Sequence, residues 1–82
     1  MELASSYLTD RTTVERAIAE NTIDGVPFGH ANDDWQRLLV KMRAGDELWH
    51  FAPPADSHSL RLWGVALVRD GVVISTVIVA VD

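Results

Sequence analysis

Residues 63–81 read WGVALVRDGVVISTVIVAV, and the Asp70-Gly71 pair inside this stretch decides the fold. Two runs rich in β-branched and apolar residues flank the pair. A two-residue type I′ turn needs positive φ at both central positions, a conformation that Asp and Gly tolerate. The stretch therefore predicts a C-terminal antiparallel β-hairpin.

Alternation outward from this turn assigns the side chains of the hairpin to two faces. The face with the bulkier residues, which we expect to meet helices, pairs Arg69 with Val72, Leu67 with Ile74, Val65 with Thr76 and Trp63 with Ile78. The other face pairs Val68 with Val73, Ala66 with Ser75 and Gly64 with Val77. Because this other face is also apolar and continues into Val79 and Val81, the hairpin is predicted to have two apolar faces.

Two helices are predicted before the hairpin. Residues 1–10 fit either a helix or a strand. Thr12 followed by Glu15 has the spacing of a capping box, which predicts a helix from there to about Glu20. A second helix is predicted from an N-cap at Asn32 or Asp33 to a glycine stop at Gly45. Its apolar stripe consists of Trp35, Leu38, Leu39 and Met42.

A loop and a third strand complete the pattern. Glycine and proline break the helical periodicity of residues 22–31, and we expect Val26 and Phe28 to plug this loop into the core. Residues 46–52 alternate as a strand with two occupied faces, which Pro53-Pro54 ends. One side of this strand carries Leu48, His50 and Ala52, and the other carries Trp49 and Phe51.

The 82 residues thus predict one α+β domain, residues 1–82, with two helices packed on a C-terminal antiparallel sheet of about three strands that ends in the hairpin. Helices of this length cover one face of such a sheet. The other face must then be shielded by the N-terminal segment, by loops or by another chain.

Composition restricts the partners. The net charge of −5 argues against nucleic acid, because its binders neutralise phosphates with Lys and Arg, but suits a basic protein surface. The lack of cysteine excludes disulfides and thiolate sites. Residues 1–10 lack the features of a signal peptide, and the apolar run of residues 72–81 is too short to span a bilayer. We therefore expect a cytoplasmic protein with no membrane partner.

The histidines offer an alternative function. No pair of His30, His50 and His58 has a recognised metal-ligand spacing, and no nucleophile motif is present, so no metal, cofactor or catalytic residue is predicted. His30, Asp33 and His50 would be the polar residues of a small ligand-binding or enzymatic domain. Its pocket would lie between the loop of residues 25–30 and the sheet.

Residues 45–54 read GDELWHFAPP, and residues 64–73 read GVALVRDGVV. This pattern, over the C-terminal half of the chain, resembles small uncharacterised bacterial proteins. The resemblance implies a bacterial, cytoplasmic α+β protein and brings no activity, cofactor or catalytic residue with it.

The leading hypothesis is a small bacterial protein-binding module, such as an immunity protein, an inhibitor or a regulator, because the chain is small, acidic and apolar on two sheet faces. The partner is expected to be another protein or a second copy in a homodimer, and a self-associating structural protein is a further alternative. The predicted contact residues are Trp49, Phe51, Asp46, Glu47, Val77 and Val79.

Overall fold

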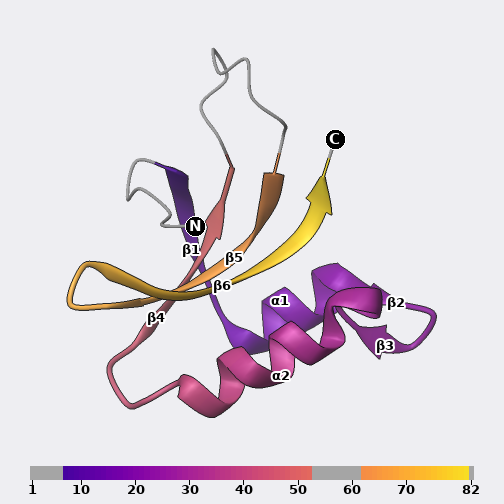
Figure 1. Cartoon of the computed structure of the whole chain (residues 1–82), viewed down its shortest axis with the longest axis horizontal. Coiled ribbons are helices and arrows are strands. Elements are labelled where there is room, and N and C mark those ends of the chain that lie inside the picture. Colours follow the sequence, from indigo (N-terminus) through magenta and orange to yellow (C-terminus); the bar gives the residue numbers. More distant parts are fainter. Residues whose placement is uncertain (1–6, 53–61, 82) are drawn as a thin grey trace.

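The computed structural model describes residues 7–52 and 62–81. The elements follow in the order β1 (Leu8–Thr12), α1 (Val14–Asn21), β2 (Thr22–Ile23), β3 (Val26–Pro27), the 3₁₀ turn η2 (Gly29–Ala31), α2 (Asn32–Lys41), β4 (Glu47–Phe51), β5 (Leu62–Arg69) and β6 (Val72–Val81). Strands β1, β4, β5 and β6 form one antiparallel sheet in that order, and β2 pairs with β3. Both helices lie on the same side of the four-stranded sheet (Figure 1).

These elements confirm an α+β fold with two helices and a C-terminal hairpin, but the expected number of strands is wrong. The sheet has a fourth strand because part of the ambiguous N-terminal segment forms β1 on the free edge of β4. Since β1 extends through Thr12, helix α1 begins one residue later than its capping box suggested. The side chain of Thr13 is the N-cap, and its Oγ1 accepts a hydrogen bond from the backbone N of Arg16 at 3.2 Å. The expected end of β4 at Pro53-Pro54 lies outside the described residues.

The reversal between β5 and β6 is the one that the sequence predicts. Asp70 and Gly71 have φ of 53° and 79°, and the first two pairs, Arg69 with Val72 and Val68 with Val73, are confirmed. Beyond them the predicted register is wrong. Ile74 is an extra residue, a β-bulge, so Ser75 rather than Ile74 lies opposite Leu67.

The bulge exchanges the faces of residues 75–79 of β6. Val77 pairs with Val65 and is fully buried on the side of the helices, whereas Ile78 pairs with Gly64 and is 39% exposed. The alternation had placed these two residues the other way round. A second bulge follows at Val79, since Trp63 pairs with Ala80.

The main core lies between the sheet and the helices. Trp35 and Leu38 of α2 are buried there, as the predicted stripe requires, together with Leu48 and Leu67 of the sheet. Phe28 stacks on Trp35 with ring centroids 4.3 Å apart. The loop therefore enters the core through Phe28, as expected, but not through its second candidate, because Val26 remains 44% exposed. Trp63, also expected in the core, is 42% exposed.

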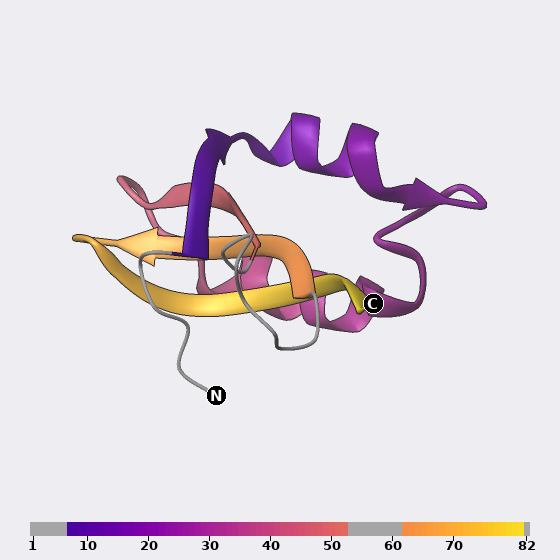
Figure 2. The same ribbon diagram turned by 90° about the horizontal axis from the view of Figure 1, so that it is seen from above.

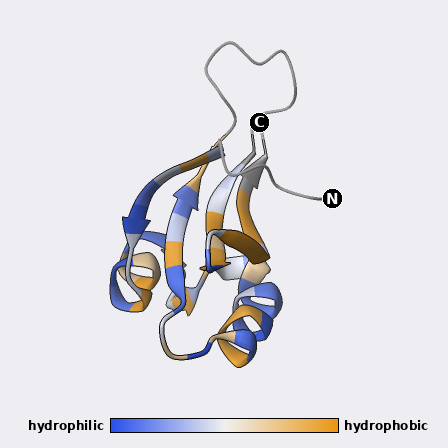
Figure 3. Cartoon of the chain, turned by 90° about the vertical axis from the view of Figure 1, so that its left-hand side faces the viewer, coloured by the Kyte–Doolittle hydropathy of each residue, from blue (hydrophilic) through white to orange (hydrophobic). Residues whose placement is uncertain are grey.

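The helices do not cover the sheet equally. Helix α2 packs against β6 and lies behind the β5–β6 hairpin in Figure 2. In the same view α1 lies away from this hairpin, next to the end of β1. The two edges of the sheet also differ in polarity (Figure 3): β1 reads LTDRT, whereas β6 has no charged residue over its ten positions. Among the described residues, no helix is long and apolar enough to cross a membrane.

Candidate functional site

The second face of the sheet, defined as the face opposite α1 and α2, carries an apolar cluster of its own. Phe51, Ala66 and Val68 are buried in its floor. Partly buried apolar residues pack around this floor, namely Tyr7, Leu8, Trp49 and Val73. None of these described residues belongs to either helix, so the expectation of a sheet with two apolar faces is confirmed even though the register differs.

Three side chains form a row across β1 and β4 on this face. Arg11 lies directly opposite Trp49 in the register, and Glu47 precedes Trp49 by two residues on the same face. The indole Nε1 of Trp49 donates a hydrogen bond to Oε1 of Glu47 at 2.9 Å. The other oxygen of Glu47 lies 3.7 Å from Nη1 of Arg11. The carboxylate thus holds the indole in one orientation and keeps a cation beside it.

Asp46, one of the expected contact residues, is occupied by a different role. Its carboxylate is 2% exposed and accepts hydrogen bonds from Nε and Nη2 of Arg69, each at 2.8 Å, and from the backbone N of Arg43 at 2.9 Å. The hydrogen bonds from Arg69 lower the pKa of Asp46 to about 2, and the same contact raises the pKa of Arg69. Asp46 therefore has a structural role, because its hydrogen bonds connect the segment after α2 to β5.

The remaining expected contact residues are divided between the faces. Trp49 and Glu47 are partly exposed on the second face, and Phe51 lies in its floor at 2% exposure. Val77 and Val79 instead belong to the main core on the other side, because the bulge at Ile74 turns them inward. Arg11 and Tyr7, which sequence reasoning missed, complete the second face. The signal for Tyr7 was the strand alternative for residues 1–10, which stops one residue before Arg11.

Of the three residues predicted to form a polar pocket, only His50 lines one, and its hydrogen-bond partners are Asp10 and Glu20. His50 lies on β4, and its Nδ1 is 2.9 Å from Oδ2 of Asp10, while its Nε2 is 3.2 Å from Oε1 of Glu20. The hydrogen bond with His50 lowers the pKa of Asp10. His30 in η2 and Asp33 in the first turn of α2 are exposed and do not line this pocket.

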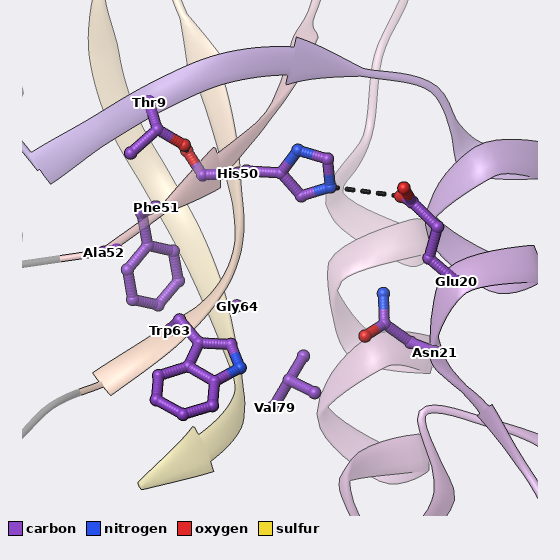
Figure 4. Close-up of a pocket in the computed structure, with 9 residues that line it drawn as sticks. All are labelled: Thr9, Glu20, Asn21, His50, Phe51, Ala52, Trp63, Gly64 and Val79. Carbon is purple, nitrogen blue, oxygen red and sulfur yellow. Dashed lines mark hydrogen bonds and ion pairs between the residues drawn. The ribbon is translucent and has the colours of Figure 1, made fainter. Parts of the chain in front are cut away.

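The pocket encloses about 330 Å³ between the end of α1 and the far ends of β5 and β6 (Figure 4). It is lined by Thr9, Glu20, Asn21, His50, Phe51, Ala52, Trp63, Gly64 and Val79. The imidazole of His50 stands between its two carboxylates, so they do not converge on a common point. Accordingly, no group of three or more His, Asp or Glu within residues 7–52 and 62–81 is arranged to hold a metal ion.

A scan of the chain against protein-family models and searches of the curated proteins and of the solved structures found no match. Function is therefore inferred from the geometry of this chain alone.

Proposed function

We propose that the chain is a small protein-binding module that recognises another protein through the second face of its sheet. The observation that carries this proposal is the row of Arg11, Trp49 and Glu47, in which a carboxylate fixes the orientation of a partly exposed indole. A side chain that is ordered before association loses less conformational entropy when it binds.

The residue types of this face support a protein as the ligand. Trp, Tyr and Arg are the residues most enriched among those that dominate binding energy, and Trp49, Tyr7 and Arg11 lie together here. The apolar floor around Phe51 and the exposed Ile78 provide a surface that gains from losing water. A largely apolar face bordered by charged side chains such as Arg11 and Glu47 resembles a protein interface more closely than a small-molecule cleft.

Charge supports a basic partner. The chain carries a net charge of −5, and several of its acids, including Asp24, Asp33 and Asp34, are exposed on the loop and helix side. Such charges speed diffusional encounter with a basic protein without having to lie in the contact. An immunity protein, inhibitor or regulator in a bacterial cytoplasm is the role that we propose within this class.

The experiment is a capture assay with matched tryptophan variants. The immobilised chain is exposed to an extract of its host, and the captured protein is then purified and titrated calorimetrically against wild type, Trp49→Ala and Trp63→Ala. We expect Trp49→Ala to weaken binding by about thirtyfold or more, the effect of losing one dominant contact. Trp63→Ala serves as the control, because Trp63 lies in the pocket away from the Trp49 row.

Equal capture by wild type and Trp49→Ala would overturn the proposal. Light scattering of the purified chain separates the remaining alternative. A dimer that dissociates in Trp49→Ala would identify the partner as a second copy of the chain, with the same face as its interface.

A further inference from the structure

The pocket beside His50 presents hydrogen-bond acceptors around an aromatic wall. The side-chain N of Asn21 donates to the backbone oxygen of Ala17 at 2.8 Å, so its oxygen is left facing away from the helix. Figure 4 shows this oxygen directed toward Trp63 and Val79, with the carboxylate of Glu20 above it. The polar groups at this end of the pocket thus accept hydrogen bonds, while Trp63 and Val79 supply apolar surface.

From this arrangement we infer that the pocket binds a small organic cation, an ammonium group carried on an apolar or aromatic body. An ammonium group offers only donors, which match the acceptors of Glu20 and Asn21. The face of an indole also attracts cations. An anion would instead meet the carboxylate of Glu20, and both ring nitrogens of His50 already face carboxylates, those of Asp10 and Glu20.

The volume indicates how much of a ligand this pocket, which is partly open to solvent, can hold. At roughly 30 Å³ for each water-sized group, about 330 Å³ holds a compound of roughly ten non-hydrogen atoms. This is the size of 2-phenylethylamine, whose ring matches Trp63 and whose ammonium group matches Glu20. 2-Phenylethanol has the same shape without the charge.

The test uses the indole N–H signals of the three tryptophans in the NMR spectrum of the full chain. At about pH 8 and ligand concentrations on the order of millimolar, 2-phenylethylamine should shift the signal of Trp63 and leave that of Trp49 unchanged. Glu20→Gln should weaken the affinity by about tenfold, the effect of one charge-assisted hydrogen bond. Glu15→Gln is the matched control, because Glu15 lies on the same helix and does not line the pocket.

The same spectra decide against the inference if 2-phenylethanol binds as tightly as the amine, or if Glu20→Gln and Glu15→Gln bind alike. No shift of Trp63 at any concentration would also overturn it. None of these outcomes bears on the second face, because Trp49 does not line this pocket.

Discussion

Arg69 donates two parallel hydrogen bonds of 2.8 Å to Asp46, from Nε to Oδ1 and from Nη2 to Oδ2. The same guanidinium reaches the backbone oxygen of Lys41 at 3.0 Å, so one side chain at the end of β5 joins the last residue of α2 to the turn before β4. A bidentate pair of this kind is both stronger and more directional than an ordinary surface ion pair. We therefore expect it to hold α2 against the sheet.

The first prediction concerns acid. The pKa of Asp46 is about 2 in the folded chain, below the value of about 3.9 typical of an unfolded one. Its contribution to stability is therefore complete above the unfolded value and is lost as the pH falls from about 5 toward 2. Asp46→Asn should be less stable than wild type at neutral pH, and the difference should narrow over this interval. Thermal unfolding measured at a series of pH values checks it.

Asp34→Asn is the control for this series. Asp34 pairs with Arg37 at 3.1 Å, but both side chains are more than half exposed, so its loss should change the melting temperature little. The pKa of Asp10 is also lowered, which should leave some acid sensitivity in Asp46→Asn. Parallel pH profiles for wild type and Asp46→Asn would contradict the assigned role of the pair.

The second prediction concerns Phe28, which combines full burial with a left-handed backbone at φ 63°. Phe28→Ala should destabilise the chain by about 3 to 5 kcal/mol, because it removes the ring that stacks on Trp35. Phe28→Gly loses the same ring but relieves a strain of about 1 kcal/mol at this φ. We therefore expect Phe28→Gly to be at least as stable as Phe28→Ala in urea unfolding. A clearly less stable glycine variant would show that the backbone at residue 28 is not strained.

The third prediction concerns the close approach of β5 and β6 at Gly64. A Cβ at this position would collide with the backbone oxygen of Val77 and lie 3.0 Å from the backbone N of Val79. Gly64→Ala should therefore cost about 3 kcal/mol, because backbone atoms must move. Gly71→Ala, where a Cβ meets open space at φ 79°, should cost only the backbone strain of about 1 kcal/mol. Urea unfolding of the two variants should show this order. Equal losses of unfolding free energy would mean that β5 and β6 lie further apart at Gly64 than the structure shows.

The fourth prediction tests the register of β6 with two adjacent residues. Val77 is fully buried and Ile78 is 39% exposed, so Val77→Lys should destabilise the chain by about 4 kcal/mol or more. Ile78→Lys should cost less than about 1 kcal/mol, since its charge reaches water on the second face. If Ile78→Lys proved more destabilising than Val77→Lys in chemical denaturation, the regular alternation predicted from the sequence would be correct and the bulge would be wrong.

Local signals in the sequence were sufficient for the C-terminal turn and for the buried stripe of α2, but not for β1 or for the alignment of the strands. The Asp70-Gly71 turn depends on two adjacent residues, and the stripe of α2 on spacings within one helix, so both were predictable. The bulge at Ile74 depends on how the whole of β6 fits β5 and the helices beneath it. No residue type at Ile74 distinguishes it from its neighbours, and this one unpaired residue reversed the faces assigned to residues 75–79.

The candidate sites show the same limit. Trp49 was placed on the correct face by simple alternation within β4. By contrast, the two partners of His50 come from positions 40 and 30 residues earlier in the chain, on β1 and α1. Their convergence follows from the addition of β1 to the edge of β4, which the N-terminal sequence left undecided. Asp46 was predicted to be a contact residue, and its pairing with Arg69 was not foreseen because the two residues lie 23 positions apart in the sequence.

The two unpaired residues of β6 give the chain a tolerance for changes in length. Deleting Ile74 or Val79 would remove a kink and return the ladder to regular pairing, so the side chains that follow would keep their sides. Deleting Thr76 would send Val77 outward unless the neighbouring kink straightened to absorb the loss. Natural insertions and deletions in this strand should therefore occur mainly at these two positions. A residue can be added or removed there while the buried side chains of β6 stay on the side of the core.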